Sequence, residues 1–151
     1  MPCFDRFYGT ALDLISTLKT DEIKVLDLGA GTGIFAFLVS QRYPNAEFTL
    51  CDISNAMLNE AKNRFKNSRT KVEYLVKDYS AEPIVGRYDL IISALSIHHL
   101  SGAEEALFER LFLNLNKNGL FINADQVLGE TALIEKSYRN VATTSKQKWS
   151  Y

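Results

Sequence analysis

Three glycines and two aspartates are spaced as in a site that binds sugar hydroxyls and a positive charge. The run Asp27-Leu-Gly29-Ala30-Gly31-Thr-Gly33 comes directly after an apolar stretch. Glycines tolerate backbone angles and close approaches that a Cβ forbids, so a ligand can lie against bare backbone there. Asp52 ends the next apolar run, about 20 residues past the last glycine, where a carboxylate can bind ribose hydroxyls.

The spacing of this turn does not fit a dinucleotide. Dinucleotide-binding turns follow G-x-G-x-x-G, and the third position of that fingerprint is Ile34 here. A carboxylate at Asp27 suits a cationic ligand with an amino group better than a phosphate. A nicotinamide-dependent oxidoreductase is therefore a weaker alternative, and a tight turn beside a surface aspartate is the purely structural one.

The elements that must position these residues alternate between short apolar runs and longer amphipathic ones. This alternation predicts a parallel sheet covered by helices. Strands are expected at 23–28, 47–51, 72–76, 88–94 and 120–127, and helices at 5–19, at 34–42, after a cap at Ser54, and at 130–148.

A further helix is expected between the fourth and fifth strands. It would begin in a capping-box pattern at 101–104 and end at Gly119, which favours a left-handed cap. Its predicted buried stripe consists of Leu107, Phe108, Leu111, Phe112 and Leu115.

Length and charge narrow the class of protein. The chain has 151 residues, which fits a single domain over 1–151, and its net charge of −1 argues against a general nucleic-acid or anionic-membrane binder. Cys3 and Cys51 have no metal-ligand spacing, so no metal is expected. No signal peptide pattern occurs, and no apolar stretch reaches the ~20 residues of a membrane span, so a cytoplasmic protein is predicted.

Residues 25–33 resemble the first motif of the class I S-adenosylmethionine-dependent methyltransferases. Similar motifs follow in order at 50–54, 76–79, 88–94 and 115–119, so that the resemblance covers 23–127. It implies S-adenosyl-L-methionine as the cofactor, held by Asp27, Gly29, Ala30, Gly31, Gly33, Asp52, Ile53, Met57, Asp78, Tyr79, Ser93, Ala94 and Tyr8.

The resemblance also implies individual roles. Asp52 would hold the ribose, and Met57 would pack near the adenine. Asp78 would bind the adenine amino group, with the next backbone amide, that of Tyr79, on the ring. Tyr8 would touch the methionine end, although an ordinary helix–sheet contact explains it equally well.

His98 and His99 lie in the loop after the fourth strand, where the family places the methyl group. They are the candidate catalytic residues, as a base or a polar contact for the acceptor. The alternative is that one packs under the loop and the other faces water. This loop lacks the Asp/Asn-Pro-Pro-aromatic motif of the family's nucleic-acid amino-methylating members, which argues against base N-methylation.

The expected fold is α/β, a Rossmann-like doubly wound parallel sheet of about five strands with helices on both faces. It would lack the family's usual C-terminal β-hairpin and expose an apolar edge at 120–122. Three explanations stay open: a domain trimmed at its ends, a natural short form, or a protomer that pairs this edge with a second copy.

The function implied is methyl transfer to a small-molecule acceptor. The alternatives are a non-catalytic S-adenosylmethionine-binding module or partner subunit, and a tRNA or protein methyltransferase. Nucleic acid is disfavoured as a partner by the net charge, and no membrane partner is expected.

Overall fold

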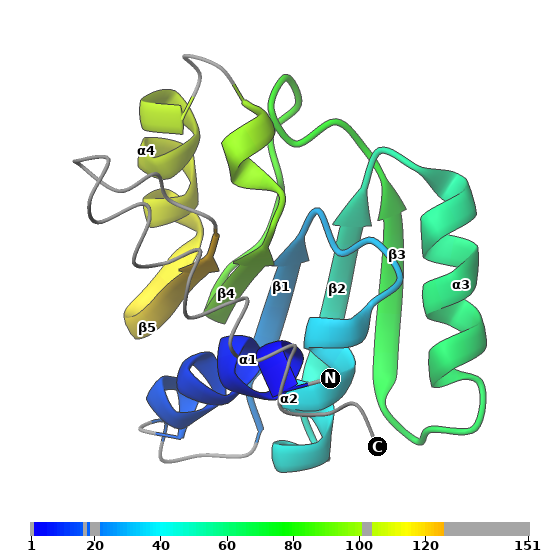
Figure 1. Cartoon of the computed structure of the whole chain (residues 1–151). Helices are drawn as coiled ribbons and strands as arrows, with labels where there is room; N and C mark the ends of the chain where they lie inside the picture. The colour runs from blue at the N-terminus through cyan, green and yellow to red at the C-terminus, as the bar shows by residue number, and fades with distance from the viewer. Residues whose placement is uncertain (1, 17, 19–21, 101–103, 126–151) are drawn as a thin grey trace, which may run out of the picture.

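The computed structural model describes residues 2–16, 18, 22–100 and 104–125 (Figure 1). In chain order the elements are α1 (Pro2–Ile15), β1 (Lys24–Leu28), α2 (Ile34–Arg42), β2 (Glu47–Asp52), α3 (Asn55–Phe65), β3 (Lys71–Val76), β4 (Tyr88–Ala94), the 3-10 turn η1 (Ile97–His99), α4 (Glu104–Asn114) and β5 (Leu115–Ala124). The predicted segments 101–103 and 130–148 lie outside the described residues.

The five described strands form one sheet in the order β3-β2-β1-β4-β5, and every neighbouring pair is parallel. The chain therefore runs outward from β1 to β3, then crosses to β4 on the other side of β1 (Figure 1). The predicted doubly wound sheet is confirmed. The carboxyl ends of β1 and β4 meet at the point where the strand order reverses, which is where ligands bind in such sheets.

Two apolar clusters cover the two faces of the sheet. Helices α1, α2 and α3 pack on one face, where Ile15, Val39 and Leu58 are fully buried against β1, β2 and β4. Helix α4 covers the other face through Leu107 and Leu111. The sheet is thus covered by helices on both faces, as a doubly wound α/β fold requires.

Helix α3 begins as the sequence predicts. The Ser54 hydroxyl accepts a hydrogen bond from the backbone N–H of Met57 at 3.3 Å, the pattern of a serine N-cap. Leu58, Ala61 and Phe65 are buried, whereas Met57, one position before Leu58, is about half exposed. Its side chain lies at the carboxyl edge of the sheet instead.

The predicted boundary between the fourth helix and the fifth strand is wrong. Helix α4 ends at Asn114 and Leu115 already pairs with Tyr88, whereas the prediction continued the helix to Gly119. The left-handed residue is Asn118, with φ of 65°, inside a bulge of β5. Residues from Leu115 onward form a strand because pairing with β4 provides hydrogen-bond partners for their backbone groups. In addition, Arg87 Nη1 donates to the Leu115 carbonyl at 2.9 Å.

The predicted buried stripe of α4 is partly wrong. Leu107 and Leu111 are buried, but Phe112 is 78% exposed and Phe108 is 37% exposed. Phe108 and Phe112 each follow a buried leucine by one position, about 100° further around the helix, so they lie off the face that Leu107 and Leu111 bury. Phe108 still contacts Phe121 of β5, with ring centroids 5.7 Å apart.

Candidate functional site

A cleft of about 350 Å³ opens at the carboxyl ends of β1, β2 and β4. It contains eight of the predicted cofactor residues: Tyr8, Asp27, Gly29, Ala30, Gly31, Asp52, Met57 and Ala94. The sequence did not single out five further lining residues: Thr32, Ile34, Phe35, Leu95 and Ser96. Larger hollows at the opposite edge of the sheet are lined by mixed charges of the strand beginnings, away from the glycine turn.

The three turn glycines have left-handed backbone, with φ of 63°, 54° and 71° at Gly29, Gly31 and Gly33. The space available for a Cβ differs among the three glycines. A Cβ on Gly29 would collide with Ser96, and one on Gly33 would press on Ala61 and Leu50 at 3.0 and 3.1 Å. A Cβ on Gly31 would meet no atom within 4 Å, because this glycine faces open space at the cleft.

Asp52 ties the ends of β1 and β2 together. Its Oδ2 accepts a hydrogen bond from the Gly31 backbone N–H and its Oδ1 accepts one from Ser54 N–H, both at 2.8 Å. These bonds fix the carboxylate at the rim of the cleft. Both oxygens keep a lone pair for a further donor, so the carboxylate can still accept hydrogen bonds from a ligand.

Asp27 is the most unusual group of the cleft. It is 1% exposed, and its Oδ2 has no hydrogen-bond partner among the described residues. Burial raises the pKa of this carboxyl to about 8, and the nearby charge of Asp52 adds to the rise, while a hydrogen bond from the Ala36 backbone opposes it. Leaving a buried hydrogen-bond acceptor without a partner costs free energy. Because Asp27 lines the cleft, a ligand with a positively charged donor could provide the missing partner.

Tyr8 closes the cleft from α1. Its ring lies on Phe35 of α2, with centroids 5.1 Å apart and planes tilted by 54°. Burial raises the pKa of the Tyr8 phenol, and the charge of Asp27 adds to the rise. An aromatic wall therefore stands beside the acid, which suits an organic cation.

The loop after β4 carries a strained residue at the cleft. Leu95 has φ of 53°, although only glycine adopts this conformation without strain, and its N–H donates to the Ala124 carbonyl at 3.0 Å. Such outliers concentrate at functional sites. Next to it, the hydroxyls of Ser96 and Tyr79 are hydrogen-bonded at 2.6 Å.

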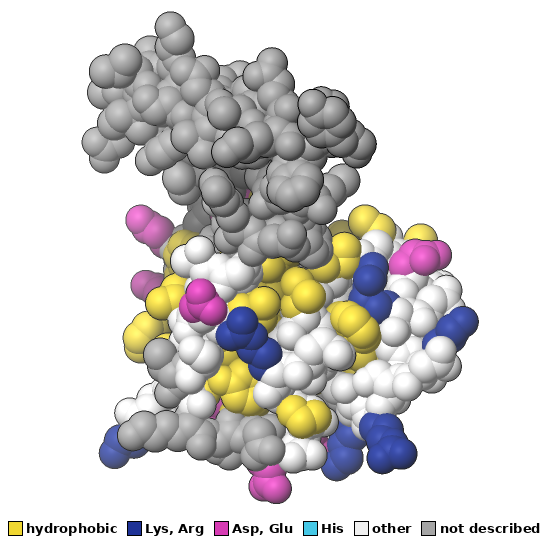
Figure 2. Space-filling model, turned by 60° about the horizontal axis from the view of Figure 1, so that its bottom comes forward, with side chains coloured by type: hydrophobic (Ala, Val, Ile, Leu, Met, Phe, Trp, Pro, Cys, Tyr) yellow, Lys and Arg dark blue, Asp and Glu magenta, His cyan; other side chains and the backbone are white. Residues whose placement is uncertain are grey.

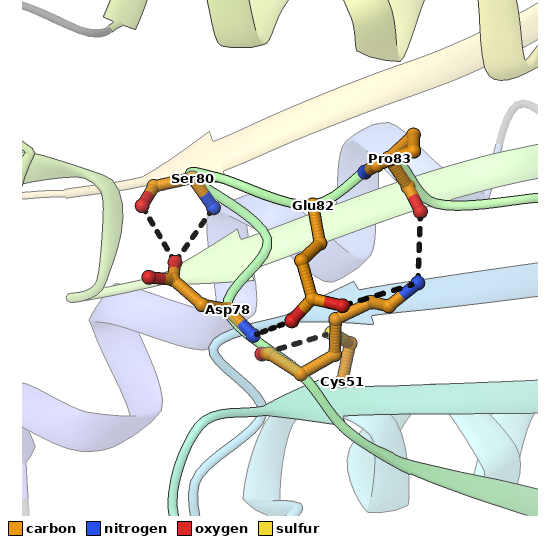
Figure 3. Close-up of polar contacts among 6 residues, drawn as sticks. Cys51, Asp78, Ser80, Glu82 and Pro83 are labelled. Atoms are coloured by element: carbon orange, nitrogen blue, oxygen red, sulfur yellow. Dashed lines mark hydrogen bonds and ion pairs between the residues drawn. The ribbon is translucent and has the colours of Figure 1, made fainter.

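Five predicted cofactor residues do not line the cleft. Ile53 is 68% exposed, and a Cβ on Gly33 would lie against Ala61 and Leu50. Ser93 is fully buried, and its hydroxyl donates to the Leu28 carbonyl at 3.0 Å. Asp78 Oδ1 accepts hydrogen bonds from the N–H and the hydroxyl of Ser80 (Figure 3), which lower the pKa of this carboxyl. Tyr79 is buried behind Ser96.

Figure 3 shows how the segment after β3 is braced beside Asp78. The Lys77 ammonium donates to the Pro83 carbonyl at 3.0 Å and lies 3.9 Å from Glu82, whose carboxylate also accepts from Asp78 N–H at 3.3 Å. Burial raises the pKa of the neighbouring Cys51 thiol to about 12, so this cysteine stays neutral and is no nucleophile.

The structure describes the side chain of only one of the two candidate catalytic histidines. His99 ends the turn η1 and is exposed, and it does not line the cleft; the side chain of His98 is outside the described residues.

Within the described part of the chain, no three His, Cys, Asp or Glu side chains come together as metal ligands. None of the described helices is both long enough and apolar enough to cross a membrane.

Removing the Tyr79 hydroxyl should loosen the loop after β4. We expect Tyr79→Phe to lower the free energy of unfolding by about 1 kcal/mol and to weaken binding of S-adenosylhomocysteine, because Ser96 lines the cleft. Tyr88→Phe is the matched control: Tyr88 is as buried, and its hydroxyl donates to the Val85 carbonyl at 3.2 Å. Urea unfolding should show similar losses, and calorimetry an affinity change for Tyr79→Phe alone.

Comparisons with known proteins agree with this geometry. A family described as a methyltransferase domain matches residues 25–119, more than half of the chain. Carboxy-S-adenosyl-L-methionine synthase of Nautilia profundicola is 22% identical over 100% of this chain and 64% of its own length. Ribosomal RNA small subunit methyltransferase C of Haemophilus influenzae is 33% identical over 93% of this chain and 44% of its own.

Among solved structures, coclaurine N-methyltransferase bound to N-methylheliamine and S-adenosylhomocysteine superposes with a TM-score of 0.67 at 25% identity. The match covers 77% of this chain and 34% of that one. The chain thus spans well under the full length of the proteins it resembles. The oxidoreductase alternative is excluded by the family match, and the chain belongs to the class I S-adenosylmethionine-dependent methyltransferases.

Proposed function

We propose that this chain binds S-adenosyl-L-methionine in the cleft and transfers its methyl group to a small-molecule acceptor. The observation that carries the proposal is the buried, unpartnered Oδ2 of Asp27 in a cleft floored by Gly31. A buried carboxyl without a partner, beside bare backbone, fits a ligand that has both a cationic end and an adenosine.

Each element of the cleft has a place in this proposal. Asp27 would hold the ligand's positively charged amino group, and Asp52 would bind ribose hydroxyls at the rim. Met57, about half exposed at the start of α3, would cover the adenine. When bound, the cofactor supplies a methyl group already activated by a sulfonium, so the protein's task is to position the acceptor in line with it.

Leu95 and Ser96 are the described residues best placed for that positioning, because both line the cleft in the strained loop after β4. We infer no base from the chain's described side chains. An acceptor that is already a nucleophile at neutral pH, such as an amine or a carboxylate, needs none. The bound N-methylheliamine in the structural relative supports a small organic acceptor.

An RNA acceptor is the second candidate, and the ribosomal RNA methyltransferase relative favours it. Figure 2 looks onto the edge where the strands begin, away from the cleft, and there the Lys and Arg side chains stand in separate groups with apolar and uncharged surface between them. A continuous basic stripe would be expected of a broad RNA surface. Affinity for RNA that falls steeply with salt would favour this candidate over the small molecule.

Cofactor binding is tested by thermal unfolding with S-adenosylhomocysteine and, in parallel, NAD. A ligand at 100 times its dissociation constant adds about 2.7 kcal/mol, a shift of several degrees. We expect S-adenosylhomocysteine alone to stabilise the wild type, and Asp52→Ala to lose most of that shift.

Asp89→Ala is the matched control, since Asp89 also accepts two hydrogen bonds, from Lys24 N–H at 2.9 Å and Asn116 Nδ2 at 2.7 Å, at the opposite edge of the sheet. Its ligand-induced shift should equal that of the wild type. Stabilisation by NAD, or by neither ligand, would contradict the proposal. Transfer of labelled methyl to a panel of small amines and acids, with ribosomal RNA alongside, then distinguishes an enzyme from a module that only binds the cofactor.

A further inference from the structure

Asp27 sits where a charge is expensive and no partner compensates it. Its neighbours across the sheet, Leu50 on β2 and Ile92 on β4, are apolar and fully buried. Oδ2 is buried without a hydrogen-bond partner among the described residues, although the residue lines the cleft. The protein alone therefore favours the protonated form of a carboxyl that lines the cleft.

The groups that act on Asp27 can be named element by element. On β2, Asp52 and Cys51 interact with it, and Asp52 is the one whose charge opposes ionisation. On α1, the described group is the Tyr8 phenol, which is neutral at pH 7. Helix α2 contributes the Ala36 backbone N–H, which favours the carboxylate but does not outweigh burial. None of these described groups is a cation.

We infer that the cleft exchanges a proton for its ligand: Asp27 is protonated in the free protein and releases that proton when a ligand with an ammonium group binds. The O–H bond of the carboxyl breaks, the proton goes to the solvent, and the ammonium takes its place beside the carboxylate. The inference rests on the proposed function, because it takes the amino-acid end of the cofactor as that cation.

The exchange has two consequences for binding. The cleft selects ligands that carry the ammonium, since only these offset the cost of the buried charge. Affinity for the ligand also falls as the pH falls, because protons compete with the ligand's ammonium group for the Asp27 carboxylate. With a carboxyl pKa of about 8, about 0.9 proton is released per ligand at pH 7, so lowering the pH from 7 to 6 weakens binding nearly tenfold.

Isothermal titration calorimetry tests this with the whole chain and S-adenosylhomocysteine at pH 7. Titrations in phosphate and in Tris, whose ionisation enthalpies differ, count the protons released. The second ligand is 5′-methylthioadenosine, which keeps the adenosine and the thioether but lacks the amino-acid end. We expect about 0.9 proton released for the first ligand and none for the second.

Two variants sharpen the result. Asp27→Asn cannot release a proton, so its binding of S-adenosylhomocysteine should be weaker and nearly independent of pH between 6 and 7. Asp89→Asn, at the opposite edge of the sheet, should release protons as the wild type does. If wild type binds S-adenosylhomocysteine without proton release, or releases as much with 5′-methylthioadenosine, the exchange is wrong while the proposed function stands. If neither ligand binds, the proposed function itself is wrong.

Discussion

Alanine at Gly29 is expected to abolish binding of S-adenosylhomocysteine and to lower the free energy of unfolding by about 3 kcal/mol. The left-handed backbone, φ of 63°, costs a residue with a Cβ about 1–2 kcal/mol. The new methyl group would also collide with Oγ and Cβ of Ser96, and displacing a packed group costs about 1–3 kcal/mol. Ser96 lines the cleft, so its displacement deforms the site.

The other glycines separate these two contributions. Gly31→Ala has the same left-handed strain, φ of 54°, but no atom within 4 Å of its Cβ, so it should lose only about 1–2 kcal/mol. Gly9 lies inside α1 with nothing within 4 Å of its Cβ, and Gly9→Ala should gain about 1 kcal/mol from helix propensity. Urea unfolding of the three variants measures these differences. Equal losses at Gly29 and Gly31 would mean that Ser96 moves aside freely.

The sequence predicts the frame of the site because that frame depends on local patterns. An apolar run, a glycine turn and an acid at the next strand's end are each readable within a few residues, and they place Asp27, Gly31 and Asp52 in one cleft. Helix α2 has the bounds predicted, since Gly33 starts it and Pro44 follows its end.

What the sequence misses depends on contacts between distant segments. The β5 boundary is set by pairing of Leu115 with Tyr88, which no window around Gly119 reveals. Leu95 and Ser96 enter the cleft through a strained turn and a bond to Tyr79, and leucine in that conformation has no sequence signature. The sequence likewise does not reveal that the Asp78 carboxylate bonds Ser80 or that the Tyr79 hydroxyl bonds Ser96. The expected adenine contacts of the Asp78 carboxyl and the Tyr79 backbone amide stay predictions.

Asp27→Asn is expected to stabilise the ligand-free protein increasingly as the pH rises. The folded-state pKa of about 8 lies above the unfolded value near 3.8, so between these values the folded state holds a proton that the unfolded state has lost. The stability that the neutral acid contributes is complete below pH 4 and is lost as the pH rises toward 8. Asparagine cannot ionise, keeps an oxygen for the Ala36 N–H, and escapes this loss.

The advantage of Asp27→Asn over wild type should therefore grow by about 2.5 kcal/mol between pH 5.5 and pH 7.5, as measured by urea unfolding. Asp78→Asn is the control: hydrogen bonds from Ser80 lower the pKa of the Asp78 carboxyl, so it is ionised in both states and its difference from wild type should stay constant. A constant difference for Asp27→Asn as well would mean that the buried carboxyl is ionised in the free protein. The opposite result is that the stability advantage of Asp27→Asn grows with pH while its binding of S-adenosylhomocysteine is weaker. Asp27 would then lower the stability of the free protein and be retained because its charge is needed when the ligand is bound.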